Sequence, residues 1–493
     1  MDSLRIHRSD NVIVALRDLK AGEDIIADGH HIILKDDINR GHKVAAADIP
    51  AGSRIIKYGC PIGMATEDIS KGSHVHTHNV RTGLSEDGVY EYRPAAGSLP
   101  KTEGKTFMGF KRDKGRPGIR NEIWILPTVG CVNSVARCLA GENQDLLTGS
   151  VEGLYAFTHP YGCSQMGEDH ENTKKLLAAL TRHPNAGGVL ILSLGCENLT
   201  QEQFKEELRE WNDKRVKFLV CQDVGDELAE GRQLLKELIG YASKSKREEI
   251  DASELVLGLK CGGSDGLSGI TANPVVGACS DMLISMGGSA VLTEVPEMFG
   301  AEELLFNRCR DRDTFDKAVE MVKEFKAYFT SHGQVVYENP SPGNKAGGIT
   351  TLEDKSCGCV QKGGTAPVSD VLAYAQGVKC RGLSLLSGPG NDLVSTTALA
   401  ASGVHMILFT TGRGTPFGAP VPTLKISTNT ALFERKGSWI DFNAGTVADG
   451  SESIENAAQR LIDHVLDTAS GKLTRQEVGE YREIAIFKDG VTL

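Results

Sequence analysis

The feature that most constrains the fold of this sequence is a series of short apolar segments, nearly all of which run into polar, glycine-rich loops. These segments lie at 123–126, 188–192, 217–220, 255–259, 289–292, 383–386 and 405–409. Amphipathic helices are predicted between or after them, for example over 172–182 and 227–241. Continuous apolar strands that alternate with helices are typical of parallel sheets covered on both faces. The predicted fold class is therefore α/β, with mainly parallel sheets.

The first 85 residues have a different pattern, which predicts a small all-β module. Short apolar runs occur at 12–16, 31–34 and 53–58. Glycine-containing turns separate these runs, and three of the turns resemble one another, at 18–22, 48–52 and 68–72. Each begins with Asp and ends with Gly. We expect each of them to be a turn that leads into the next strand.

These patterns divide the chain into domains, since 493 residues exceed what one hydrophobic core usually holds. We predict an all-β domain at 1–85, a linker at 86–104, an α/β domain at 105–245 and a C-terminal α/β domain at 252–493. The linker is predicted because no periodic apolar pattern continues through it. A charged segment at 243–251 separates the two α/β domains.

Charge and composition exclude several classes of function. The chain has 54 basic and 65 acidic side chains, a formal net charge of −11, and no basic run longer than the interrupted stretch at 111–116, so we expect no nucleic-acid partner. No apolar run is long enough to span a membrane, and the first residues do not resemble a secretory signal. We therefore expect a cytoplasmic protein whose twelve cysteines are reduced thiols.

Glycine is over-represented, with 56 residues, and the excess falls in the loops after the predicted strands. In open α/β sheets ligands bind beyond the carboxyl ends of the strands, so these loops are the candidate active site. The richest loops lie at 260–274, 339–355 and 410–418. Shorter loops at 293–297 and 387–392 add carboxylates that can act as acid, base or ligand.

Histidines and cysteines offer two different metal sites. His74, His76 and His78 alternate, so a strand would place all three on one side, and His42 belongs to the same module. Cys163, Cys196 and Cys261 each lie beside glycine at a predicted strand end, where three thiolates can hold an iron–sulfur cluster. No CxxC pair supports a structural zinc site. Both alternatives stay open at this point, beside ordinary thiols and imidazoles without a metal.

Five short motifs stand out along the chain: GHK at 41–43, PTVGC at 127–131, CGGSDG at 261–266, NPSPGNKAGG at 339–348 and TGRG at 411–414. Together they resemble the altronate dehydratase and galactarate dehydratase family. Further stretches resemble the altronate branch, at 74–76, 127–133 and 412–416. The resemblance runs essentially from end to end. It implies an N-terminal domain similar to the β-clip SAF domain and activity that depends on Fe²⁺ or Mn²⁺.

The reaction implied by this resemblance is conversion of D-altronate to 2-dehydro-3-deoxy-D-gluconate and water, a step in hexuronate breakdown. Such an elimination needs cations for the carboxylate, an acid or base, a Lewis acid and partners for the remaining hydroxyls. We expect Arg413 and Lys345 to bind the carboxylate. Candidate catalytic residues are His42, Lys345 and Asp265. Candidate substrate-binding residues are Ser264, Asn273, Asn344, Arg413 and Thr415.

The metal ligands follow the two alternatives above. Either N-terminal histidines, His74 and His76 first, hold a mononuclear Fe²⁺ or Mn²⁺ together with loop carboxylates, or Cys163, Cys196 and Cys261 hold a cluster. Other functions also fit the loops: a dehydratase for galactarate or another aldonate, or a sugar-acid binding protein without catalysis. We expect a small sugar acid as ligand and a homo-oligomer as assembly.

Overall fold

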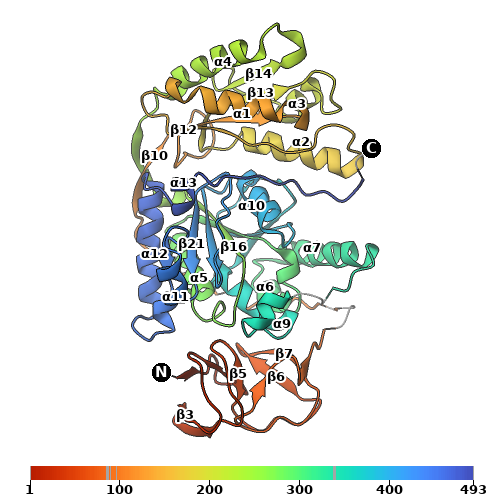
Figure 1. Cartoon of the computed structure of the whole chain (residues 1–493), viewed down its shortest axis with the longest axis vertical. Coiled ribbons are helices and arrows are strands. Elements are labelled where there is room, and N and C mark those ends of the chain that lie inside the picture. The colour runs from red at the N-terminus through yellow and green to blue at the C-terminus, as the bar shows by residue number, and fades with distance from the viewer. Residues whose placement is uncertain (1, 85–87, 89, 96, 337–339, 492–493) are drawn as a thin grey trace.

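Three domains are stacked along the long axis of the molecule in the computed structural model (Figure 1). The structure describes residues 2–84, 88, 90–95, 97–336 and 340–491. The N-terminal all-β domain lies at one end, the C-terminal α/β domain in the centre, and the middle α/β domain at the other end. The predicted class, an all-β module followed by parallel α/β domains, is confirmed. Parts of the predicted linker, and Asn339 at the start of one predicted loop, lie outside the described residues.

The N-terminal domain consists of short strands joined by tight turns. Its strands are β1 (Ser3–Leu4), β2 (Val12–Ala15), β3 (Asp24–Ala27), β4 (His30–Ile33), β5 (Lys43–Ala45), β6 (Arg54–Lys57), β7 (Cys60–Ala65), β8 (His74–Val75) and β9 (Val80–Arg81). They form three antiparallel sheets, in the orders β1-β2-β5-β8, β3-β4 and β6-β7-β9. Two small clusters of buried aliphatic side chains fill the space between the sheets.

The three related turns are confirmed, and their glycines explain the pattern. Gly22, Gly52 and Gly72 have φ values of +86°, +75° and +86°, a region that residues with a Cβ rarely adopt. Each is followed within two residues by the start of a strand: β3, β6 or β8. The Asp at the head of each turn accepts a backbone hydrogen bond from another turn or a neighbouring loop, as Asp68 does from Ala51 at 2.8 Å.

The middle domain is a four-stranded parallel sheet in the order β12-β11-β13-β14. Its elements are β11 (Glu122–Pro127), α1 (Asn133–Glu142), β12 (Gly153–Ala156), α2 (Gly167–Thr181), β13 (Ala186–Ser193), α3 (Gln201–Leu208), β14 (Val216–Val220) and α4 (Glu227–Ala242). Every residue of β11 and β13 is buried, as their continuous apolar sequences predict.

The C-terminal domain contains a seven-stranded parallel sheet in the order β18-β19-β17-β16-β20-β21-β22. Its strands are β16 (Val256–Cys261), β17 (Ser289–Leu292), β18 (Val368–Leu372), β19 (Gly382–Leu386), β20 (Met406–Thr411), β21 (Thr423–Ser427) and β22 (Phe442–Asn443). After β16 the chain adds β17, β18 and β19 on one side of that strand. It then crosses to the other side and adds β20, β21 and β22. The strand order therefore reverses between β16 and β20, where open α/β sheets bind their ligands.

Helices cover both faces of this sheet. They are α5 (Ala272–Ser285), α6 (Glu302–Phe306), α7 (Arg312–Ser331), α8 (Pro342–Ala346), α9 (Leu352–Cys359), α10 (Asp392–Ala401), α11 (Thr430–Arg435), α12 (Ile454–Ala469) and α13 (Arg475–Val478). No described helix is long and apolar enough to cross a membrane.

The two α/β domains share a core and an extra ribbon. One cluster of buried side chains runs from Trp124 and Leu176 in the middle domain to Leu399 and Phe409 in the C-terminal domain. The charged segment between the domains contains β15 (Arg247–Asp251), which pairs antiparallel with β10 (Thr106–Phe110). The sequence pattern did not indicate this strand, because Ile250 is its only buried residue.

Candidate active site and metal centre

The N-terminal domain contacts the C-terminal domain at glycine-rich loops. The loop after β16 and the loop after α8 meet at a 2.7 Å hydrogen bond from the amide of Gly266 to the carbonyl of Gly347. Gly41 lies against both loops, and a Cβ added at Gly266 would lie 2.0 Å from the Gly41 carbonyl oxygen. Glycine is therefore required here, because any side chain would separate the two domains. This contact brings His42 to the loops that follow the C-terminal sheet.

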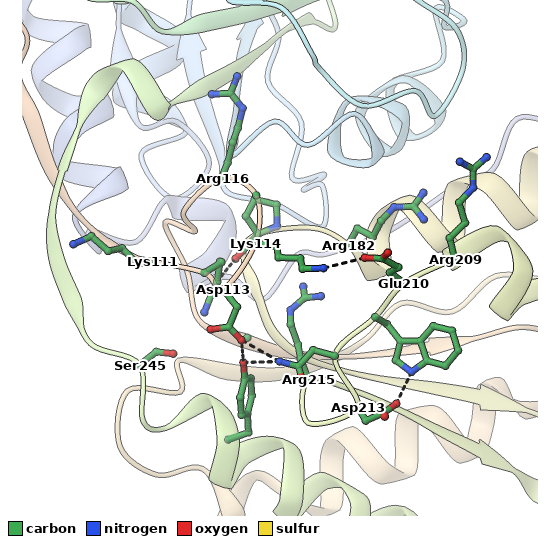
Figure 2. Close-up of a pocket in the computed structure, with 17 residues that line it drawn as sticks. Lys111, Asp113, Lys114, Arg116, Arg182, Arg209, Glu210, Asp213, Arg215 and Ser245 are labelled. Carbon is green, nitrogen blue, oxygen red and sulfur yellow. Dashed lines mark hydrogen bonds and ion pairs between the residues drawn. The ribbon is translucent and has the colours of Figure 1, made fainter.

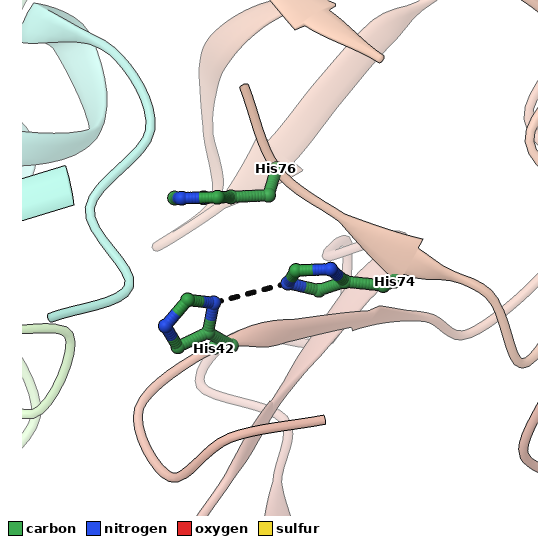
Figure 3. Close-up of side chains that lie close together, drawn as sticks. All are labelled: His42, His74 and His76. Carbon is green, nitrogen blue, oxygen red and sulfur yellow. Dashed lines mark hydrogen bonds between the residues drawn. The ribbon is translucent and has the colours of Figure 1, made fainter. Parts of the chain in front are cut away.

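His42, His74 and His76 form one cluster at this junction (Figure 3). Nδ1 of His42 lies 3.0 Å from Nε2 of His74, and its Nε2 lies 3.4 Å from the carbonyl oxygen of Ala346 in α8. The ring centroid of His76 is 4.8 Å from that of His42. Only His74 is in a strand, since β8 ends at Val75, yet His76 still turns toward the same side. The ring of His78 packs against His74, with 5.3 Å between centroids.

Burial and mutual repulsion keep these imidazoles neutral. Burial, and then the neighbouring imidazoles, lower the pKa of His74 to about 4. Burial, then the ammonium group of Lys43 and the neighbouring imidazoles, lower the pKa of His76 to about 3, and burial also lowers the pKa of His42. A neutral imidazole offers a lone pair, which is the state that binds a divalent transition metal.

A buried ion triad, which includes Lys43 directly after His42, joins the N-terminal domain to the C-terminal domain. The carboxylate of Asp354 in α9 accepts from Nζ of Lys43 at 2.7 Å and from Nζ of Lys57 at 3.0 Å. All three side chains are buried. Although burial opposes its charge, the two lysines hold the pKa of Asp354 well below its ordinary value. Lys43 also donates to the carbonyl of Gly348 at 2.7 Å.

Lys345 and Arg413 lie at the rim of this junction, and both are exposed. Lys345 belongs to α8, one residue before the Ala346 carbonyl that faces His42. Nη2 of Arg413 donates to the carbonyl of Gly343 in the same helix at 2.7 Å. The structure thus brings the two predicted carboxylate-binding cations to one short helix beside the histidine cluster. Thr415 follows in the same loop, where its hydroxyl accepts from the amide of Phe417 at 3.3 Å.

The remaining predicted loop residues hold the loops in place. Nδ2 of Asn344 donates to the carbonyl of the buried Ser264 at 2.8 Å. Asp265 accepts from the hydroxyls of Ser268 at 3.0 Å and Thr428 at 2.9 Å, and burial raises its pKa. Asn273 is buried within α5 and uses both ends of its amide internally, with the carbonyl of Gly358 and the hydroxyl of Thr410. Asn273 therefore does not face a substrate in this arrangement.

Cys261 is buried in a second polar cluster, at the carboxyl ends of β16 and β17. Its Sγ lies 3.5 Å from Sγ of Cys359 and 3.0 Å from Oε2 of Glu297. Nζ of Lys362 donates to the same sulfur at 2.7 Å and to Glu294 at 3.1 Å. Three lysines and three carboxylates alternate through this cluster; they are Lys260, Lys355, Lys362, Glu294, Glu297 and Asp392.

The two clusters differ as metal sites. In the part of the chain that the structure describes, each brings three donor atoms within 4.8 Å of one another. Around Cys261 the charges are already balanced, and Lys355 and Lys362 bind the carboxylate and the thiol that a metal would need. A divalent cation there would meet three buried ammonium groups. The neutral imidazoles of His42, His74 and His76 face no such competition, so the histidine cluster fits a metal ion and the Cys261 cluster does not.

The structure does not bring Cys163 and Cys196 to Cys261. Both lie in loops of the middle domain, where Sγ of Cys163 contacts Asn198 and Sγ of Cys196 contacts Gln222. Cys261 is buried in the C-terminal domain, and its sulfur neighbour is Cys359. The predicted set of three cysteines is therefore divided between two domains.

A basic cavity of about 900 Å³ opens elsewhere, in the middle domain (Figure 2). Arg112 and Arg215 line it and donate to backbone carbonyls, for example to those of Pro184 at 2.7 Å and Thr181 at 2.9 Å. The cavity lies where β13 and β14 begin. Ligands of parallel sheets bind at the opposite, carboxyl edge, so this cavity is not the candidate active site.

Sequence reasoning missed the buried lysines that organise both clusters. Lys57 and Lys260 each come at the end of an apolar run, Lys362 lies in the polar stretch at 361–364, and the predicted site includes none of the three. A lysine inside an apolar strand, such as Lys260 in β16, is a signal, because an ammonium group is rarely buried without a carboxylate partner. The backbone of Glu294 in the same cluster is also unusual, because its φ is +70°. A non-glycine residue adopts this conformation only at an energetic cost.

Comparison with known families agrees with the motifs quoted above. Residues 1–83 match the altronate/galactarate dehydratase SAF domain, and residues 109–243 match the D-galactarate dehydratase/altronate hydrolase second domain. Residues 252–492 match the D-galactarate/altronate dehydratase C-terminal domain. The N-terminal module is thus an SAF domain, as the resemblance implied.

Curated relatives match over the whole length. An altronate dehydratase of Bacillus subtilis is 54% identical, with 99% of each chain covered, and one of Escherichia coli is 51% identical, with 100% of each covered. A galactarate dehydratase (L-threo-forming) of Escherichia coli is 35% identical and covers 98% of this chain, with 96% of the relative matched. On this evidence the chain belongs to the D-galactarate/altronate dehydratase family.

Proposed function

We propose that this protein is a metal-dependent hydro-lyase that converts D-altronate to 2-dehydro-3-deoxy-D-gluconate and water. Two altronate dehydratases share more than half of its residues, against 35% for the galactarate enzyme. The structural observation that carries the proposal is the convergence of three neutral imidazoles with Lys345 and Arg413 at α8. A metal-binding group beside two cations is what dehydration next to a carboxylate requires.

The C-terminal domain and the N-terminal domain contribute different groups to the proposed reaction. Removing the proton beside the carboxylate is unfavourable until that carboxylate is neutralised, and Arg413 and Lys345 supply the positive charge. His42, His74 and His76 would hold Fe²⁺ or Mn²⁺, which when bound supplies Lewis acidity toward the leaving hydroxyl.

If His42 serves as a ligand, Lys345 in its neutral amine form would take the proton, and Arg413 alone would then neutralise the carboxylate. Asp265 then holds the loop through Ser268 and Thr428. We assign recognition of the sugar hydroxyls to Ser264 and Thr415, because the amide of Asn344, like that of Asn273, already binds neighbouring loop groups. We propose a cytoplasmic role in hexuronate breakdown and a homo-oligomeric assembly, consistent with a sugar-acid substrate.

An anaerobic assay with protein from which a chelator has removed bound metal tests this proposal. The chelated protein is incubated with Fe²⁺ or Mn²⁺ and with D-altronate, galactarate or other aldonates, and 2-keto acid formation is followed. We expect product from altronate only when the metal is added. If the protein converts galactarate in preference to altronate, it is a galactarate dehydratase instead. Binding of altronate without any keto acid would indicate a binding protein instead.

A further inference from the structure

Three glycine–cysteine pairs lie at one edge of the middle domain's sheet. Cys131 follows the end of β11 by four residues, and Cys196 follows the end of β13 by three. Cys163 lies in the loop from β12 to α2. The strands β12, β11 and β13 are neighbours and parallel, so their carboxyl ends share one edge. Topology therefore gathers three cysteine-bearing loops where parallel sheets place their functional groups.

Hydrogen bonds between the loops hold this edge together. The hydroxyl of Thr128, in the loop of Cys131, donates to the buried carboxylate of Glu197, the neighbour of Cys196, at 2.7 Å. The amide of Gly130 donates to the carbonyl of Tyr161 at 2.8 Å. The amide of Leu199 donates to the carbonyl of Gly162 at 3.1 Å. Each cysteine loop is thus tied to another by at least one direct bond.

The three thiols are accessible, unlike those of the C-terminal core. Cys131 and Cys196 are exposed and Cys163 is half-buried, whereas Cys261 and Cys359 are buried. Nε2 of Gln222 donates to Sγ of Cys196 at 3.5 Å, and hydrogen bonds to the sulfurs are among the groups that tune iron–sulfur sites. The thiol of Cys163 instead donates to Oδ1 of Asn198 at 3.4 Å, a bond that cluster binding would replace.

Backbone strain marks the same place. Ser164, directly after Cys163, has a φ of +58°, and its amide is held at 2.8 Å by Oδ1 of Asn198. A left-handed serine costs free energy that the loop must offset elsewhere, and such strain concentrates at functional sites.

The spacing of the sulfurs separates a single ion from a cluster. A tetrahedral ion with metal–sulfur bonds of about 2.3 Å holds its sulfurs roughly 3.8 Å apart. In the described part of the chain, the groups that bring three donors within 4.8 Å do not include these cysteines. The three sulfurs are therefore too far apart for one tetrahedral ion, and a cofactor that contains several iron and sulfide ions is the larger group that three thiolates can hold.

We propose that Cys131, Cys163 and Cys196 hold an iron–sulfur cluster at the carboxyl edge of the middle domain. Three thiolates leave one iron of a four-iron cluster open to a ligand from outside the protein. Cys131 takes the place in this set that sequence reasoning gave to Cys261. The site is separate from the histidine cluster, and it stands or falls independently of the proposed dehydratase activity.

Full-length protein, purified without oxygen and reconstituted with Fe²⁺ and sulfide under reducing conditions, tests the site directly. Iron, acid-labile sulfide and visible charge-transfer absorption are measured for the wild type and single Cys→Ser variants. We expect about equal iron and sulfide in the wild type. We expect C131S, C163S and C196S each to lose most of both. Circular dichroism and thermal unfolding check that each variant is folded.

The chain contains matched controls. Cys138 is exposed on α1 of the same domain, and Cys221 follows β14 at the same edge without a preceding glycine, so C138S and C221S should keep the cluster. C261S should also keep it, because Cys261 lies in the other domain. Iron without sulfide, a wild type that binds neither, or loss in C261S with retention in C131S would each overturn the assignment. H76A should lose dehydratase activity and retain the cluster, which separates the two sites.

Discussion

At the scale of single residues, His76 tests whether the imidazole cluster binds the metal ion. Its ring lies beside His42 and His74, and its Nδ1 is 3.3 Å from the hydroxyl of Thr350. Replacing His76 by Ala removes one of three ligands, so we expect weaker Fe²⁺ binding and an activity at least about 100-fold lower. Isothermal titration with Mn²⁺ and steady-state assays measure both effects.

His30 provides the matched control, because it is an exposed histidine of the same domain, outside the cluster. H30A should leave metal affinity and turnover within about two-fold of the wild type. Equal metal affinity in H76A and the wild type would show that the ion binds elsewhere.

Substitutions of Arg413 test whether its guanidinium group binds the carboxylate of the substrate. Its guanidinium is anchored to the Gly343 carbonyl, which leaves further N–H groups to bind a carboxylate. A charge-assisted hydrogen bond is worth about 1.5–3 kcal/mol, so R413A should lower kcat/KM by roughly 10- to 100-fold. R413K retains the charge but not the planar fork, and should recover only part of this loss. R435A, at an exposed arginine of α11, is the control and should match the wild type.

Substitutions of Lys345 distinguish a role in binding the carboxylate from a role in proton transfer. If it only neutralises the carboxylate, K345R should restore most of the kcat/KM that K345A loses. If it transfers the proton, K345R should stay as impaired as K345A in kcat, because an arginine side chain does not deprotonate in this pH range. Comparison of kcat and KM for the two variants decides between these roles.

At the scale of elements, α9 links the two polar clusters. Asp354 near its start binds Lys43 and Lys57 of the SAF domain, and the next residue, Lys355, binds Glu297 at 2.7 Å. Cys359 at its end contacts Cys261. One helix of eight residues thus reaches from the domain junction to the buried ion network.

Asp354→Asn should destabilise this junction strongly. It leaves two buried ammonium groups without a carboxylate, which costs about 3–5 kcal/mol. Urea denaturation followed by circular dichroism should show the loss as a lower free energy of unfolding. The triple variant K43M/K57M/D354L removes every charge of the triad and should recover part of this loss.

A surface pair supplies the comparison. Asp313 and Lys317 of α7 form an exposed ion pair at 2.7 Å, and D313N should change the free energy of unfolding by less than about 1 kcal/mol. If D354N were as mild as D313N, the triad would not hold the domains together.

At the scale of the whole molecule, the proposed active site combines residues of two domains that are far apart in sequence. The histidines come from the SAF domain, and Lys345 and Arg413 come from the C-terminal domain. The described part of the connecting segment runs along the C-terminal domain, where Tyr90 donates to Glu302 at 2.9 Å and Tyr92 to the carbonyl of Cys309 at 2.8 Å.

Cutting the chain between residues 84 and 90 should therefore preserve the site as long as both pieces are present. Co-expressed as two polypeptides, they should copurify, because the buried triad and the glycine contacts lie outside the cut. Activity should be within about ten-fold of the intact enzyme, since the linker adds only effective concentration. Each piece alone should be inactive. Activity of residues 90–493 alone would remove the SAF domain from the catalytic site.

Local patterns were sufficient for much of the fold. The apolar segments at 123–126 and 255–259 became buried parallel strands because burial on both faces requires continuous apolar sequence. The repeated turns ended in glycines with positive φ, a preference that the residue itself carries. The motif strings were specific enough to indicate the family, and the polar loops were indicated correctly as lying at strand ends.

The sequence by itself thus determined the α/β class, the SAF module and the family, because each depends on neighbouring residues. Only the tertiary structure decided which loops meet. It joined His42 to α8, separated Cys261 from Cys163 and Cys196, and placed Lys43 and Lys57 on Asp354. A buried charge is tolerated only beside its partner, and here the partner lies about three hundred positions away. No local pattern encodes that pairing.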